Sequence, residues 1–129
     1  MAITIQTAAR NAACDAIVDL VDGGAGAGTI EIKSAASTVA GTSEVATLTF
    51  SDPAFGAAAA GVATAAAITS DTNATGGTAS DYTVFDSNST AIWQGSVGTS
   101  GQDLNLSSTT IGAGDTVSIS SFTMTMPAS

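Results

Sequence analysis

The spacing of apolar residues changes once along this chain, at a glycine-rich run over residues 23–28. Before the run, apolar positions recur with the helical period of about 3.6 residues, and after it they alternate with the strand period of about two. The change therefore predicts a helix at about 7–22, a glycine-rich linker at 23–28 and a β-domain at 29–126. At 129 residues the chain fits one domain, 1–129. We expect a mainly β fold, an antiparallel β-sandwich or jelly-roll-like barrel with one N-terminal α-helix.

The predicted helix is amphipathic. Thr7 can cap it, and its aspartates gather on one side. A solvated face is the simplest interpretation of those aspartates, and docking against a basic patch of a larger assembly is the alternative. The residues expected to face the protein core are Ala9, Ala12, Ala13, Ala16, Ile17 and Leu20, and those on the far side are Asn11, Asp15, Asp19 and Asp22.

Six later segments show strand alternation, separated by Ser-, Asn- and Gly-rich breaks. The first is expected to be half-buried, with Glu31 and Lys33 on its other face. Residues 82–93 read as a hairpin, and in the last segment the facing residues change side around Ser121, as at a bulge or a strand crossing between sheets. The segments are 29–35, 44–51, 61–69, 78–86, 90–97 and 116–126.

The side chains that most enzymes use are nearly missing. The chain has no histidine, one cysteine, two cationic residues and eleven carboxylates. General acid–base and nucleophilic catalysis depend on such groups, so we expect no catalytic residues, no cofactor and no enzymatic activity. Cys14 has no base to activate it and is interpreted as a small packed side chain. The net charge of −9 argues against nucleic acid and anionic membranes as partners.

Two motifs have weak functional interpretations. Asp71, Asn73 and Thr75 match the opening of a calcium loop, but Tyr82 stands where the closing glutamate is required, so an Asx turn is the default. The run 23–28 superficially resembles a phosphate loop, yet it follows a helix and precedes a strand, so it is interpreted as a helix stop. No basic leader precedes an apolar stretch, and we expect synthesis in the cytoplasm.

Three blocks of sequence resemble a group of small proteins encoded by tailed bacteriophages, often among their virion structural genes. They are ATLTFSDPAFGAAAAGVATAAAI at 46–68, WQGSVGTSGQDLNL at 93–106, and residues 116–126; the opening AARNAACDAIVDLVDGGAGAGTIEI is also similar. The resemblance implies a structural component of the virion, a head decoration or cement protein on the capsid surface. Its partners would be the major capsid protein, copies of itself, or both.

Candidate contact residues follow from this interpretation. Phe55, on the loop that Pro53 stiffens, is a possible anchor, and Asp15, Asp19 and Asp22 offer a charged helix face. A core rich in alanine buries little area, so contact with a partner would add burial. A tail, fibre or baseplate module is the main alternative. A carbohydrate-binding or calcium-stabilised β-domain, with glycans held through Trp93 and Tyr82, is the further one.

Overall fold

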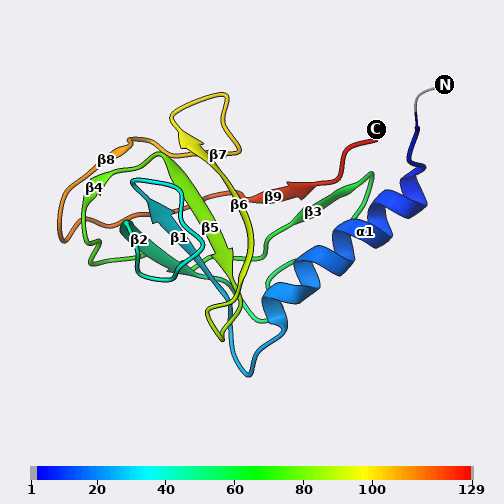
Figure 1. The fold of residues 1–129 in the computed structure, drawn as a ribbon, viewed down its shortest axis with the longest axis horizontal. Helices are drawn as coiled ribbons and strands as arrows, with labels where there is room; N and C mark the ends of the chain where they lie inside the picture. Colours follow the sequence, from blue (N-terminus) through cyan, green and yellow to red (C-terminus); the bar gives the residue numbers. More distant parts are fainter. Residues whose placement is uncertain (1–2, 129) are drawn as a thin grey trace.

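The computed structural model describes residues 3–128 and shows a curled β-body with a projecting arm (Figure 1). The helix α1 (Thr7–Asp19) runs on into a short 3₁₀ turn, η1 (Leu20–Asp22), so helical structure covers the predicted range. The strands are β1 (Thr29–Lys33), β2 (Glu44–Thr49), β3 (Val62–Thr64), β4 (Gly77–Thr78), β5 (Asp81–Phe85), β6 (Ala91–Gly98), β7 (Leu104–Asn105), β8 (Thr110–Ile111) and β9 (Thr123–Thr125).

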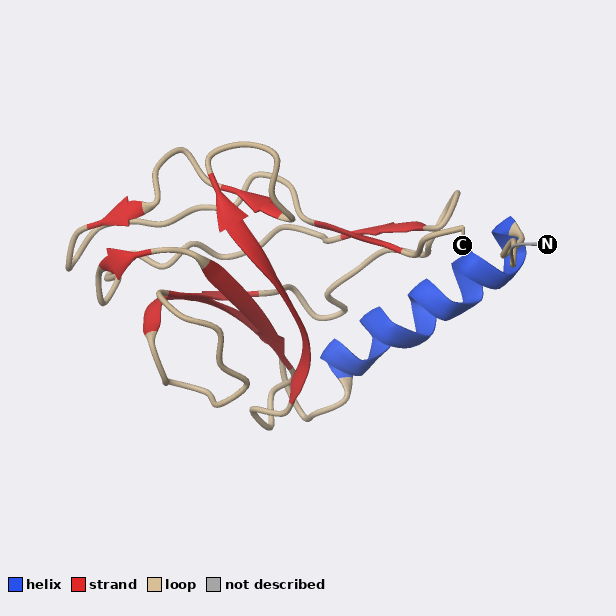
Figure 2. Cartoon of the chain, turned by 45° about the horizontal axis from the view of Figure 1, so that its top comes forward, coloured by secondary structure: helices blue, strands red, loops and turns tan. Residues whose placement is uncertain are grey.

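The main sheet has five strands in the order β2-β1-β5-β6-β7. Its pairs are antiparallel except β6 and β7, which run parallel through Val97 and Gly98. The sheet curls into a half-barrel, and two small two-stranded sheets, β3-β9 and β4-β8, complete the β structure (Figure 2). The prediction of a mainly β fold with one N-terminal helix is confirmed.

The core lies inside the curl of the sheet. Ile30 and Ile32 from β1 and Val84 from β5 are fully buried there, as their alternation predicts. Phe122 packs edge-on against Tyr82, with ring centroids 5.3 Å apart, and stacks parallel to Trp93 at 6.2 Å. Aromatic pairs at such distances add stabilisation beyond their buried area. A few large rings thus fill a core that is otherwise rich in small residues.

The hairpin and the change of side near Ser121 both appear as predicted. β5 and β6 pair directly across residues 86–90, and the Asp86 carboxylate accepts the N–H groups of Asn88 and Thr90 at 2.9 Å. In the last segment the buried positions pass from Val117 and Ile119 to Phe122. This change accompanies the transfer of the chain from pairing with residue 71 to pairing with β3.

The prediction of a half-buried β1 is wrong. Glu31 and Lys33 are also buried, because the loop over residues 34–43 folds across their face. The Lys33 ammonium donates to Glu31 Oε1 at 2.8 Å and to the loop carbonyls of Val39 at 3.1 Å and Thr42 at 2.8 Å. A buried charge needs such complete hydrogen bonding, so this lysine is fully occupied within its own chain.

The arm consists of α1 lying along the β3-β9 ribbon, and it extends away from the half-barrel (Figure 2). A small apolar cluster of Cys14, Val18 and Ala63 joins helix and ribbon. At the tip, the Ile5 N–H donates to the Ala128 carbonyl at 2.6 Å, so the two ends of the described chain lie together. The arm therefore has a thin core of its own, distinct from that of the body.

Candidate functional site: the arm and the cleft beside it

The helix packs on the ribbon with a different face from the one predicted. Cys14, Val18 and Val21 are buried, at positions i, i+4 and i+7 of one helical stripe. The predicted inner face is instead mostly exposed: Ala9, Ala12 and Ala16 are open to solvent. The prediction was wrong because alanine buries too little surface to decide the orientation of a helix, whereas valine and cysteine side chains find apolar partners.

Polar side chains beside the buried stripe hold the helix to a single chain segment, residues 54–61, which ends in a turn. Asp15 Oδ1 accepts the Ala58 N–H at 2.7 Å, and Asp22 Oδ1 accepts the Ala54 N–H at 2.9 Å. Asn11 Oδ1 accepts the Gly61 N–H at 2.7 Å. The solvated-face interpretation is therefore wrong for Asp15 and Asp22. These side chains satisfy backbone donors that lack strand partners.

Asp19 differs from its neighbours. It is exposed, and its carboxylate accepts no hydrogen bond within residues 3–128. It occupies the last position of α1, where the negative end of the helix dipole disfavours an anion. Leu20 follows it with 55% of its surface exposed, and Ile17, one turn away, is half-buried. The outer helix face thus ends in an exposed leucine beside a carboxylate that its own chain leaves free.

The aromatic anchor proposed on the 51–56 loop is occupied inside the protein. The Phe55 ring lies 5.5 Å from Phe50 and 6.0 Å from Trp93 between centroids, and it is half-buried in the aromatic core. Pro53 is exposed beside it. Phe55 therefore supports the junction of arm and body, and Pro53 alone of this pair lies open to a partner.

The calcium-loop candidates are used in local hydrogen bonding. Asp71 Oδ1 accepts the Asn73 N–H at 2.9 Å, which forms the predicted Asx turn, and Oδ2 accepts the Thr47 N–H at 2.8 Å. Thr75 donates its hydroxyl to Glu44 at 2.8 Å. Across residues 3–128, no three His, Cys, Asp or Glu side chains are grouped so that they could hold a metal ion.

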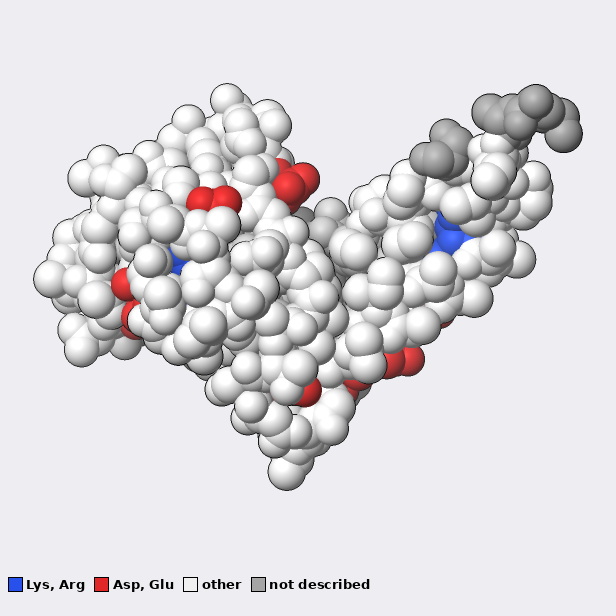
Figure 3. Space-filling view, viewed as in Figure 1, with Lys and Arg blue, Asp and Glu red and all other residues white. Residues whose placement is uncertain are grey.

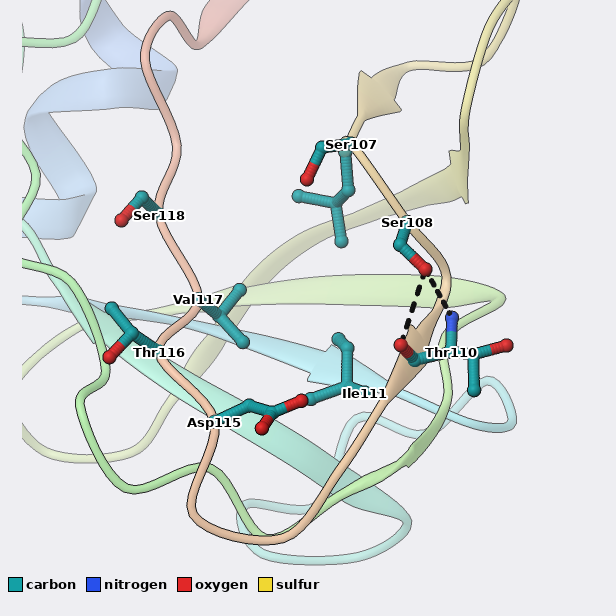
Figure 4. Close-up of a pocket in the computed structure, with 9 residues that line it drawn as sticks. Ser107, Ser108, Thr110, Ile111, Asp115, Thr116, Val117 and Ser118 are labelled. Carbon is teal, nitrogen blue, oxygen red and sulfur yellow. Dashed lines mark hydrogen bonds between the residues drawn. The ribbon is translucent and has the colours of Figure 1, made fainter.

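A shallow groove runs along the far edge of the body, with a cavity of about 190 Å³ (Figure 4). Ile111 and Val117 line it among many hydroxyl side chains. Its polar groups serve local turns: Ser108 Oγ bonds to the Thr110 backbone, and Asp115 accepts the Gly112 N–H at 2.8 Å. Of residues 3–128, none that lines the groove has an aromatic side chain that could serve as a stacking surface.

A larger cleft of about 320 Å³ lies between the body and the arm. Figure 3 shows this face hollowed between the two parts, with acidic atoms on the body side of the hollow. Strands β5 and β6, the loop before β7, and β9 supply its walls. The lining residues are Tyr82, Trp93, Gln94, Asp103, Thr123, Met124 and Thr125.

Two side chains near the arm and the cleft have raised pKa values. Burial raises the pKa of the Tyr82 hydroxyl, and the nearby Asp103 carboxylate adds to this, while the hydrogen bond from Trp93 opposes it. Burial also raises the pKa of the Cys14 thiol, with a smaller contribution from Asp15. Cys14 Sγ donates to the Met124 carbonyl at 3.2 Å, so it is a packed thiol, as its surroundings in the sequence predicted.

Comparison with known proteins found no match to a family model, a curated protein or a solved structure. Within the described range, no helix is both long enough and apolar enough to cross a membrane. The residues that sequence reasoning missed are Asp103, Thr123 and Thr125 in the cleft, because long-range folding brings them to Tyr82 and Trp93.

Proposed function

We propose that this protein is a non-enzymatic structural component of a bacteriophage particle, a decoration protein that binds the major capsid lattice and stabilises the head. The observation that carries the proposal is the outer face of α1, the helix of the projecting arm (Figure 1), with the exposed Leu20 at its carboxyl end. The sequence blocks that resemble phage virion proteins support the same function.

The size of this face favours binding in many copies. A helix of 13 residues is about 20 Å long, and one side of it covers only part of the roughly 800 Å² per partner that stable protein pairs bury. A single contact of this size is weak. On a lattice, each protein can touch more than one subunit, and the first contact raises the effective concentration for the next. Many weak contacts together can then hold a stable coat. Binding only to the assembled shell then stabilises the shell by mass action.

The charge of the arm indicates the kind of partner surface. Asp19 lies free at the carboxyl end of α1, and the chain offers little to pair with it: Lys33 is fully buried, and Arg10 donates to Thr7 and to the Ala60 carbonyl. Among the described residues of a second copy, Lys33 is buried and Arg10 is half-buried beside the Ala60 carbonyl, so a second copy offers this position little cationic surface. An apolar patch with a lysine or arginine at its edge fits both Leu20 and Asp19.

The test is the composition of purified phage particles whose genome encodes this chain. Mass spectrometry with stoichiometry is expected to find the protein in heads separated from tails, in a copy number near that of the major capsid protein. Low copy number in tails alone would instead support the tail, fibre or baseplate alternative. Absence from both fractions would contradict a virion role altogether.

A further inference from the structure

The cleft between body and arm is built around the single tryptophan of the chain. Trp93 is half-buried, and its indole forms part of the wall beside β9. The volume of the cleft, about 320 Å³, is at the lower end of the roughly 300–1,000 Å³ range of ligand pockets. A site of this size has room for one or two rings of a small polar molecule.

Tyr82 lines this cleft, and its hydroxyl proton is not used within the described chain. Tyr82 is only 4% exposed, and its ring covers Gly95 on the neighbouring strand, where any side chain would overlap it. Trp93 Nε1 donates to the Tyr82 oxygen at 3.2 Å, so the hydroxyl acts there as an acceptor. No acceptor within residues 3–128 receives the Tyr82 proton. A buried hydroxyl proton without an acceptor is unfavourable, and a ligand oxygen in the cleft would accept it.

Asp103 provides a complementary acceptor. Its Oδ2 receives the Ser96 N–H at 3.1 Å and the Ser96 hydroxyl at 3.2 Å, which fixes the carboxylate at the mouth of the cleft. Across the described part of the chain, nothing donates to Oδ1. Thr123 and Thr125, two positions apart on β9, add hydroxyl groups from the arm side. The cleft therefore combines hydrogen-bond donors and acceptors with an indole.

The charges of the cleft select the ligand class. Among the described residues, Asp103 is the one charged residue that lines the cleft, and no lysine or arginine does, so a phosphate, a carboxylate or a sulfate would be repelled. A carboxylate acceptor, hydroxyl groups and an aromatic ring together suit a neutral molecule that has several hydroxyl groups and an apolar C–H face. Neutral sugars have both features.

We propose that the cleft binds a neutral sugar unit, with Tyr82 donating to one sugar oxygen, Asp103 Oδ1 accepting from a sugar hydroxyl, and the indole of Trp93 contacting the ring. The sugar is either free in solution or the end of a longer glycan. This site is separate from the outer face of α1, so it stands whether or not the protein coats a capsid.

Because Trp93 is the single tryptophan, its fluorescence reports directly on the cleft. Titration of the purified protein with glucose, galactose, mannose and N-acetylglucosamine is expected to give a saturable change for at least one, with a Kd of about 1 mM. The matching disaccharides distinguish the two sources: tighter binding to them indicates a glycan end, and equal binding indicates a free sugar. Glucose 6-phosphate and glucuronate serve as anionic controls and are expected to bind at least ~10-fold more weakly.

Two variants test the assigned atoms. Tyr82→Phe keeps the ring on Gly95 and removes the donor, and Asp103→Asn removes the charge from the acceptor; each is expected to weaken binding about 10-fold. Asp115→Asn, in the groove at the far edge of the body, is the matched control and should bind as wild type. Circular dichroism checks that each variant is folded. No saturable change with any neutral sugar overturns the proposal, and so does wild-type affinity in folded Tyr82→Phe and Asp103→Asn.

Discussion

This protein has few large apolar side chains, and its body and its arm are held together in different ways. The body closes five strands around a continuous core that joins rings from four separate segments, including Phe50, Tyr82 and Phe122. Among the described residues, the apolar cluster of the arm has three buried members, Cys14, Val18 and Ala63, and the arm depends on helical side chains that accept hydrogen bonds from the backbone of residues 54–61. The difference indicates that the body supplies stability, while the arm leaves one face of its helix uncovered.

The largest effect is expected in the body. Phe122→Ala removes the ring that Phe50, Phe55, Tyr82 and Trp93 all contact, and should lower the free energy of unfolding by about 3–5 kcal/mol. Urea unfolding followed by circular dichroism measures it. Val39→Ala, at an exposed apolar position, is the control and should change stability by less than ~0.5 kcal/mol. A loss below about 1 kcal/mol for Phe122→Ala would show that the body does not depend on this cluster.

A smaller and local effect is expected in the arm. Asp15→Ala leaves the Ala58 N–H without its acceptor and should cost about 1–2 kcal/mol. Hydrogen exchange should quicken at Ala58 and in α1, while the amides of β1 and β5 keep their protection. Asp19→Ala is the matched control, since that carboxylate holds no amide of the described chain. Equal loss of protection in arm and body would contradict their separation.

The smallest effect is expected from alkaline pH, and it follows from the raised pKa values of Cys14 and Tyr82. Each folded-state group keeps its proton where the unfolded chain has released it, so stability is complete below the unfolded pKa and falls as pH rises through the folded pKa. The ordinary pKa of a thiol is lower than that of a tyrosine hydroxyl, so the loss of stability should begin in the arm. The tyrosine follows above about pH 10.

Tyr82→Phe sharpens this comparison. The variant should lose less stability than wild type above about pH 10, measured as the free energy of unfolding in urea at a series of pH values. Cys14→Ala should reduce the loss of stability only at the lower end of this alkaline pH range. If the free energy of unfolding of Tyr82→Phe follows the wild-type curve at alkaline pH, burial of the Tyr82 hydroxyl does not cause the loss of stability there.

The sequence predicted the body better than the arm. Two-residue alternation located β1, β2, β5 and β6. The change of buried face near Ser121 was visible because Val117 and Phe122 are an odd number of positions apart and would lie on opposite faces of a regular strand. It did not show that the 34–43 loop would cover Glu31 and Lys33, because a loop of small residues carries no periodic signal. An oppositely charged pair on one strand face was the available hint.

In the arm, the helix range was predictable and its orientation was not. The stripe of Cys14, Val18 and Val21 was present in the sequence, but the larger number of alanines on another face led to the wrong prediction of the buried face. Asp15 and Asp22 looked like solvated residues, because only the fold reveals that unpaired amides of residues 54–61 lie across them. Similarly, Tyr82 and Trp93 were recognisable as a possible glycan site, whereas Asp103 and Thr123 reach them only through the tertiary structure.

Co-sedimentation of the purified protein with capsids that lack it tests the central claim, that the outer face of the arm helix binds the shell. Leu20→Asp places a second carboxylate beside Asp19 in that face, and Val39→Asp makes the same change at an equally exposed position of the body. We expect Leu20→Asp to weaken binding at least ~10-fold and Val39→Asp to bind as wild type. Wild-type binding by a folded Leu20→Asp protein would contradict the account.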